Sequence, residues 1–188
     1  MAKRTDLRAY QESIAARLDA AQSGGGASAL LGFESGGTCW LIDLPAAGEV
    51  LPAPPLAVVP LTQAWFAGLA NVHGELDAVV DFSAFCGGPP TPREGAARLL
   101  RIGVRHGSNG ALLVERVHGL KRADALFADA DAVPPAPTFA WRGAALSDTQ
   151  GVRWFRLDVP ALLADPVFRD AALPETALPA ASSDAGEP

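Results

Sequence analysis

The most informative part of the chain is residues 65–82, which read WFAGLANVHGELDAVVDF. Residues 68–72 and 75–80 form two short apolar runs, which favour β-strands. They are joined at His73-Gly74, where glycine can adopt the positive φ that a tight hairpin needs. Asp81 stands where the second run stops, and we expect it to cap a helical turn over residues 82–85. This part of the chain therefore predicts a hairpin followed directly by a short helix.

A similar pattern lies upstream. Residues 28–34 and 38–44 are extended runs that flank Ser35-Gly36-Gly37, a second hairpin signal. The proline-rich residues 45–60 follow, and they predict turns, a sheet edge or an extended connector, because proline has no N–H for a strand ladder. Within them, Val58-Val59 predicts a brief strand.

The second half of the chain repeats the first in outline. Residues 98–105 and 111–115 match the upstream hairpin, and residues 139–146 and 152–157 match the downstream one, ending in Asp158 before another short helix. Such a repeat indicates two small units, each too small to be stable alone. Short strands with glycine turns and no long helices predict a mainly β protein of two packed five-stranded barrels.

The expected domain organisation has three parts. Residues 1–26 are expected to form an amphipathic N-terminal helix and a glycine-rich tether. Residues 27–173 form the folded domain, with a first barrel at about 27–86, a second at about 96–159, and exchange of strands between them left open. A short C-terminal helix is expected within residues 167–173, and residues 174–188 are expected to be disordered. Whether the N-terminal helix docks on its own domain or on a partner stays open.

Composition excludes several classes of protein. The chain has 188 residues and a formal charge of −6, which argues against nucleic-acid binding because phosphates require a basic face. No apolar run reaches the roughly 18–20 residues that span a bilayer, so we expect a cytoplasmic protein without direct membrane insertion. The two cysteines, Cys39 and Cys86, are expected to be free thiols.

Residues for catalysis or for binding metals and cofactors are scarce. His73, His106 and His118 have no partner at zinc-site spacing, and the chain contains no nucleophile elbow or phosphate loop. Asp81 and Asp158 could form a carboxylate pair, but their matching places in the repeat favour helix capping. We expect neither enzymatic activity nor a cofactor. The alternative is a small β-barrel ligand-binding protein or enzyme, which a large enclosed pocket lined by His73 or His106 would favour.

The central hairpin also resembles a known family. Residues 68–74 (GLANVHG) and 78–82 (AVVDF) resemble the G-x-x-N-[LVI]-R-G-x-x-x-P-[VI]-[VI]-D-L hairpin of the CheW-like chemotaxis coupling proteins. Residues 42–44 and 48–50 resemble the family's [IV]-D-I and x-E-[IV] segments, and residues 113–119 resemble its [LV]-V-D-x-V-x-G. The resemblance covers about residues 27–168.

The resemblance implies a non-enzymatic signalling adaptor with two SH3-like five-stranded barrels. Such adaptors couple the cytoplasmic tip of a methyl-accepting chemoreceptor to the regulatory domain of a CheA-type histidine kinase, and they are recruited to membrane-associated receptor arrays. The N-terminal helix and residues 154–168 are most similar to the PilI-like branch of the family, which serves twitching motility by type IV pili. That branch is the pathway implied for this chain.

The resemblance also implies which residues bind partners. The candidates are Glu49, Asn71, His73, Gly74, Asp81, Glu115 and Gly119. Asn71, Gly74 and Asp81 have a structural alternative as turn and cap residues, whereas Glu49 and His73 have no evident structural role. His73 replaces the family's arginine, which implies a weaker or pH-sensitive contact. Several apolar residues are instead expected in the core: Trp65, Phe66, Val79, Val80 and Trp154.

Overall fold

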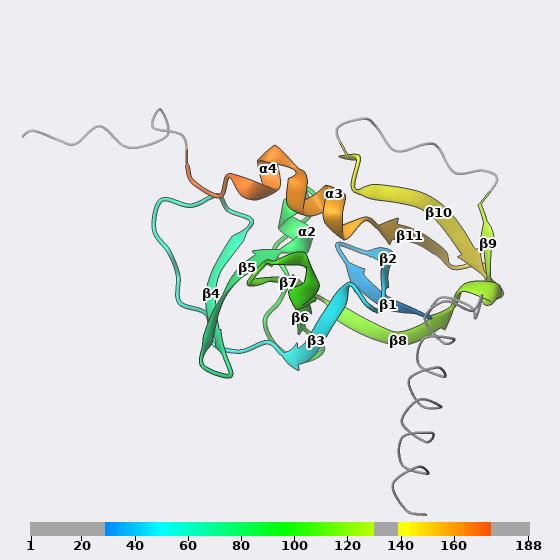
Figure 1. Cartoon of the computed structure of the whole chain (residues 1–188), viewed down its shortest axis with the longest axis horizontal. Coiled ribbons are helices and arrows are strands. Elements are labelled where there is room, and N and C mark those ends of the chain that lie inside the picture. Colours follow the sequence, from blue (N-terminus) through cyan, green and yellow to red (C-terminus); the bar gives the residue numbers. More distant parts are fainter. Residues whose placement is uncertain (1–28, 130–138, 174–188) are drawn as a thin grey trace, which may run out of the picture.

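The computed structural model describes residues 29–129 and 139–173, so the predicted N-terminal helix and C-terminal tail lie outside the described residues (Figure 1). The strands are β1 (Ala29–Ser35), β2 (Thr38–Asp43), β3 (Ala47–Pro52), β4 (Phe66–Val72), β5 (Glu75–Asp81), β6 (Arg98–Ile102), β7 (Gly110–Val114), β8 (Arg116–Arg122), β9 (Leu126–Ala128), β10 (Arg142–Asp148) and β11 (Arg153–Leu157). The α-helices are α2 (Phe82–Phe85), α3 (Val159–Ala164) and α4 (Pro166–Arg169), and single 3₁₀ turns lie at Val104–His106 and Ala123–Ala125. The predicted mainly β class with short helices is confirmed.

The strands form two sheets that do not follow the order of the chain. One sheet has six strands in the order β8-β1-β2-β11-β10-β9, and the other has five in the order β3-β6-β7-β5-β4. The two parallel pairs, β2 with β11 and β5 with β7, each join strands far apart in sequence. Figure 1 shows the sheets side by side with α2 and α3 between them. Each sheet therefore takes strands from both halves of the chain.

The central hairpin forms as predicted. Strands β4 and β5 pair in antiparallel register up to Val72 and Glu75, and the turn between them is His73-Gly74. Both turn residues have positive φ, 54° at His73 and 89° at Gly74, which is the requirement of a type I′ turn. The turn holds the His73 side chain at the tip of the hairpin.

Two sequence-based expectations about strands are wrong. Val58-Val59 is not a strand; instead Ala57 alone bridges Leu69, because the prolines around this segment remove ladder donors. The strand expected over 98–105 ends at Ile102, and Val104–His106 form a 3₁₀ turn instead.

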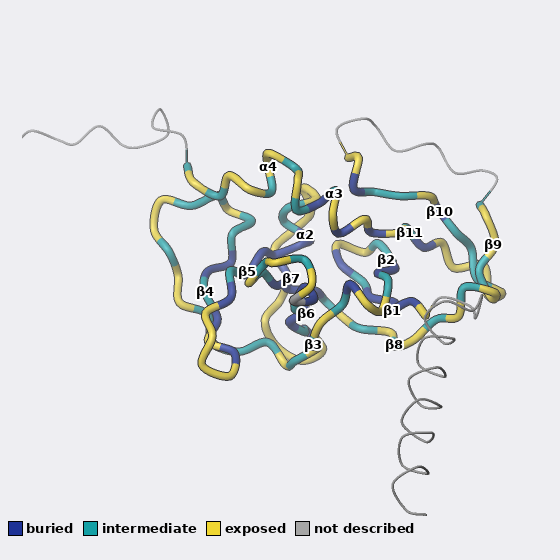
Figure 2. Tube along the Cα trace, in the orientation of Figure 1, coloured by how far each residue is buried: buried dark blue, intermediate teal, exposed yellow. Residues whose placement is uncertain are grey.

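One core connects the two sheets. It contains Phe33 and Trp40 of the six-stranded sheet, Leu100 and Leu112 of the five-stranded sheet, and Phe82 of α2. Figure 2 shows these buried segments converging where the sheets meet. The two sheets therefore stabilise each other, as expected for units too small to fold alone.

Of the expected core residues, some are buried and some only half-buried. Val79, Val80 and Trp154 are buried. Trp65 and Phe66 are half-buried, and the Trp65 ring packs on Phe85 of α2 and Phe168 of α4. The C-terminal helices thus cover the start of β4.

No helix in residues 29–129 and 139–173 is long and apolar enough to cross a membrane.

Candidate partner-binding site

Two of the candidate residues meet at the surface. Glu49 lies on β3, at one edge of the five-stranded sheet, and His73 lies at the tip of the hairpin that forms the other edge. His73 Nε2 is 3.0 Å from Glu49 Oε2 and 3.1 Å from Oε1. The side chains keep 67% and 43% of their surface exposed, so a partner can reach both. The sheet curls until its edges meet at this pair.

The side chain of Arg101 on β6 lies beside Glu49 of this pair. Its guanidinium donates to both carboxylate oxygens of Asp77, with Nη2 2.9 Å from Oδ1, and also to Glu75, with Nη2 2.9 Å from Oε2. Its Nη1 lies 4.0 Å from Glu49 Oε2. These bonds raise the pKa of Arg101, first through Asp77 and then through Glu75. We call the group the hairpin charge cluster: Glu49, His73, Glu75, Asp77 and Arg101.

The hairpin charge cluster has a buried end and an exposed end. The Asp77 side chain is fully buried and the Arg101 side chain is 19% exposed, whereas Glu75 and Glu49 are open to solvent. The cluster combines three carboxylates with one guanidinium and one imidazole. A cluster of this kind offers both hydrogen-bond acceptors and hydrogen-bond donors to a partner.

Asn71 and Gly74 shape the turn. The Gly74 N–H donates to Asn71 Oδ1 at 2.9 Å, a side-chain bond that closes the tip of the hairpin. Both residues are exposed. The geometry gives Asn71 and Gly74 the structural role and leaves the His73 side chain free to turn toward Glu49.

Asp81 is buried and holds a loop. It accepts hydrogen bonds from Ala84 N at 3.3 Å, the predicted cap of α2, and from Thr91 N and Oγ1, each at 2.7 Å. Thr91 is buried beside it. Asp158 caps α3 separately by accepting from Ala161 N at 2.9 Å. The capping interpretation of both aspartates is confirmed, and the link from Asp81 to Thr91 had no sequence signal.

We expect Asp81→Ala to lower the free energy of unfolding by about 2–3 kcal/mol, because it removes a helix cap and leaves the buried Thr91 donors unpaired. Urea unfolding followed by circular dichroism measures the change. Asp158→Ala removes only the exposed cap of α3 and is expected to cost about 1 kcal/mol. Equal losses from the two variants would contradict the assigned role of Thr91.

The two second-half candidates lie in a different place. Glu115 Oε1 accepts from Gly36 N at 2.9 Å, and its own N–H donates to the carbonyl of Glu34 at 3.0 Å. Gly119 pairs with Gly32 in the β8–β1 ladder and has a φ of 84°. Gly119 belongs to the six-stranded sheet and Glu115 links β7 to β8, so neither residue is part of the hairpin charge cluster.

Sequence reasoning missed Arg101, Asp77 and Glu75. A signal was available for two of them. Asp77 occupies an inward position in the alternation of β5, and Arg101 interrupts the apolar run of β6. A charge at an inward position requires an opposite charge nearby. The described residues contain no group of three or more His, Cys, Asp or Glu side chains that could hold a metal ion.

Comparison with known proteins gives three findings. The family model described as a CheW-like domain matches residues 29–167. Protein PilI of Pseudomonas aeruginosa is 30% identical over 114 residues, which is 61% of each chain, so this chain spans about 61% of the length of that curated relative. The crystal structure of the scaffolding protein TtCheW from Thermoanaerobacter tengcongensis superposes with a TM-score of 0.58 at 15% identity, over 70% of this chain and 88% of that one, which is a likeness of fold.

Proposed function

This chain belongs to the CheW-like domain family, and from that premise we propose that it is a non-enzymatic adaptor between a methyl-accepting chemoreceptor and a CheA-type histidine kinase. The similarity to PilI supports the narrower proposal that the pathway is twitching motility by type IV pili. In this role the protein works at receptor arrays on the inner face of the membrane. Residues 27–173 would be the adaptor domain, joined to an N-terminal helix and a C-terminal tail.

The observation that carries the proposal is the pair of Glu49 and His73. Both residues occupy positions of the family motif, they are 24 apart in sequence, and they meet at 3.0 Å on an exposed surface. Neither the Glu49 nor the His73 side chain makes a hydrogen bond to a buried residue among those that the structure describes. An exposed pair held by a rigid cluster beneath it is pre-organised for a partner, which lowers the entropic cost of binding.

We propose that Glu49 and His73 contact the partner directly. Asn71 and Gly74 shape the turn that presents His73. The side chains of Asp81 and Glu115 accept hydrogen bonds from backbone N–H groups, and Gly119 pairs with Gly32 in a strand ladder. We therefore assign these five residues a structural role and not direct contact with the partner. Glu49 offers an acceptor to a donor of the partner, and the side chain at position 73 offers a donor to a partner carboxylate.

The test is binding of the full-length chain to two purified partners, the cytoplasmic tip of the cognate receptor and the regulatory domain of the cognate kinase. Saturable binding to both, with a ternary complex in size-exclusion chromatography, is the expected result. A folded protein that binds neither partner would refute the adaptor function. Binding to the kinase alone would refute the coupling role.

His73→Arg is expected to leave the fold intact and to tighten partner binding by about fivefold. Arginine can donate two parallel hydrogen bonds to one carboxylate, which an imidazole cannot do. Isothermal titration calorimetry with each purified partner measures the effect.

The matched variants for this experiment are Glu49→Gln and Arg156→Gln. Glu49→Gln removes the anion of the pair and should weaken binding by about threefold to tenfold. Arg156 pairs with Asp43 on the other sheet, so its replacement should leave binding unchanged. Weaker binding by His73→Arg would mean that the imidazole itself makes the contact.

A further inference from the structure

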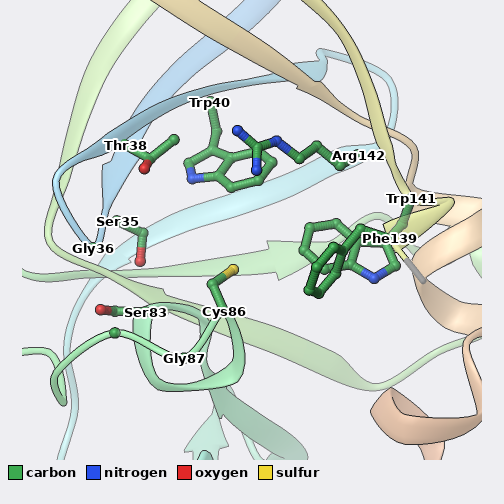
Figure 3. Close-up of a pocket in the computed structure, with 11 residues that line it drawn as sticks. Ser35, Gly36, Thr38, Trp40, Ser83, Cys86, Gly87, Phe139, Trp141 and Arg142 are labelled. Carbon is green, nitrogen blue, oxygen red and sulfur yellow. The ribbon is translucent and has the colours of Figure 1, made fainter. Parts of the chain in front are cut away.

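A pocket of about 280 Å³ lies away from the hairpin charge cluster, between the six-stranded sheet and α2. Figure 3 shows its walls, which come from the β1–β2 turn, strand β2, the end of α2 and the chain entering β10. Neither His73 nor His106 is among its described lining residues, so it is not the pocket expected for the alternative function. The lining residues used below are Ser35, Trp40, Cys86, Phe139, Trp141 and Arg142.

Three buried polar atoms of this lining have no hydrogen-bond partner in the described structure: Ser35 Oγ, Trp40 Nε1 and Trp141 Nε1. Ser35 and Trp40 are each 3% exposed, and Figure 3 shows the nitrogen edge of Trp40 facing the side of the pocket where Ser35 lies. An unpaired buried donor costs about 1–3 kcal/mol. A bound acceptor oxygen would remove that cost for Ser35 Oγ and Trp40 Nε1.

Arg142 supplies the positive charge. It is the one charged residue among the described lining, and its guanidinium makes no hydrogen bond or ion pair with another described residue. Its guanidinium stacks on Phe155 at 3.7 Å from the ring centroid and lies 5.7 Å from the centroid of Trp40. Stacking fixes the plane of the guanidinium and leaves its N–H edge available for a carboxylate.

The other walls are apolar and uncharged. Phe139 packs edge-on against Trp141 with 5.6 Å between ring centroids. The Cys86 thiol points into the space between Trp40 and Trp141 (Figure 3), and desolvation raises its pKa to about 12, so it stays neutral. The described lining therefore places no negative charge where a carboxylate would sit.

We propose that this pocket binds a small organic carboxylate with an aromatic or aliphatic body. The carboxylate accepts hydrogen bonds from Trp40 Nε1, Ser35 Oγ and the Arg142 guanidinium, while the body packs on Phe139 and Trp141. The volume lies just below the range of about 300–1,000 Å³ that is usual for ligand pockets, which suits a compact molecule of roughly ten heavy atoms. This site is separate from the proposed contact with receptor and kinase, and its test does not depend on them.

The test uses the indole N–H signals of the ¹⁵N-labelled full-length protein, which has four tryptophans and so one indole signal for each of them. Titration with phenylacetate should shift the Trp40 indole peak in a saturable manner. Trp154 serves as the internal control, because its Nε1 already donates to Asp148 Oδ2 at 3.0 Å and lies outside the pocket. Phenylacetamide, which lacks the charge, should bind at least tenfold more weakly.

Arg142→Gln should weaken phenylacetate binding by tenfold or more, and Ser35→Ala should weaken it by about threefold. Arg156→Gln, which changes an arginine on the same sheet outside the pocket, should have no effect. An unshifted Trp154 peak in each variant shows that the fold is retained.

Two results would overturn the proposal. Absence of a Trp40 shift at about 10 mM phenylacetate, or equal binding of phenylacetamide, would mean that no carboxylate is recognised. A blocked peptide with phenylalanine at a free C-terminus presents the same chemistry on a chain. If that peptide shifts Trp40 and phenylacetate does not, the ligand is a protein terminus rather than a small molecule.

Discussion

Replacing Phe82 with alanine is expected to lower the free energy of unfolding by about 3–5 kcal/mol. Phe82 has no exposed surface and lies where the cores of the two sheets meet. Its ring is 5.1 Å from that of Trp40, 5.7 Å from that of Trp141 and 5.9 Å from that of Phe33. Alanine would leave a cavity among aromatic rings that cannot collapse to fill it. Urea unfolding followed by tryptophan fluorescence measures the loss.

The control is Phe127→Ala on β9. Phe127 is 57% exposed, so its loss should change stability by less than about 0.5 kcal/mol. The Phe82 variant should still unfold in one transition, because the sheets share one core. Two separate transitions would show that each sheet is stable without the other, contrary to the packing.

Local features of this fold could be predicted from the sequence. The turn at His73-Gly74 follows from two residues, and the caps Asp81 and Asp158 follow from an aspartate placed before a short helix. In each case the residues that form the structure are neighbours in the chain. Turn and cap signals are therefore readable without knowledge of the rest of the molecule.

Pairing between distant strands could not be predicted in this way. Strand β11 joins β2 in parallel, with Phe155 beside Trp40, and no local pattern encodes a partner more than a hundred residues away. Strand β8 was missed because it is an edge strand with weak apolar alternation, in which Leu120 is 66% exposed. The core between the sheets depends on these pairings, and so does the pocket beside α2.

Only part of the candidate site could be predicted, because the rest of it also depends on pairing between distant strands. Glu49 and His73 stood out because neither had a local structural role, and the structure shows that they contact each other. Asp77 and Arg101 were overlooked because their charges are compensated only when β5 and β6 lie in one curled sheet. The exposed pair, Glu49 and His73, and the buried pair, Asp77 and Arg101, belong to one cluster. We expect the exposed pair to affect partner binding and the buried pair to affect stability.

Arg101→Gln is expected to lower the free energy of unfolding by about 3–5 kcal/mol, because it leaves the carboxylate of Asp77 buried without a counter-charge. The Asp77 side chain has no exposed surface and receives two hydrogen bonds from Arg101. Glu75 would lose its partner as well, but it is exposed and can be solvated by water. Urea unfolding at pH 7 measures the loss.

The double variant Arg101→Gln with Asp77→Asn distinguishes the buried charge from the loss of packing. If the unpaired carboxylate is the cause, adding Asp77→Asn should recover a large part of the stability, since no buried charge then remains. Arg105→Gln, at an exposed arginine without a carboxylate partner in the described structure, should cost less than about 0.5 kcal/mol. No recovery in the double variant would mean that the Arg101 stem, and not its charge, supports the hairpin. Recovery of stability with persistent loss of partner binding would instead show that Arg101 positions Glu49 for the partner.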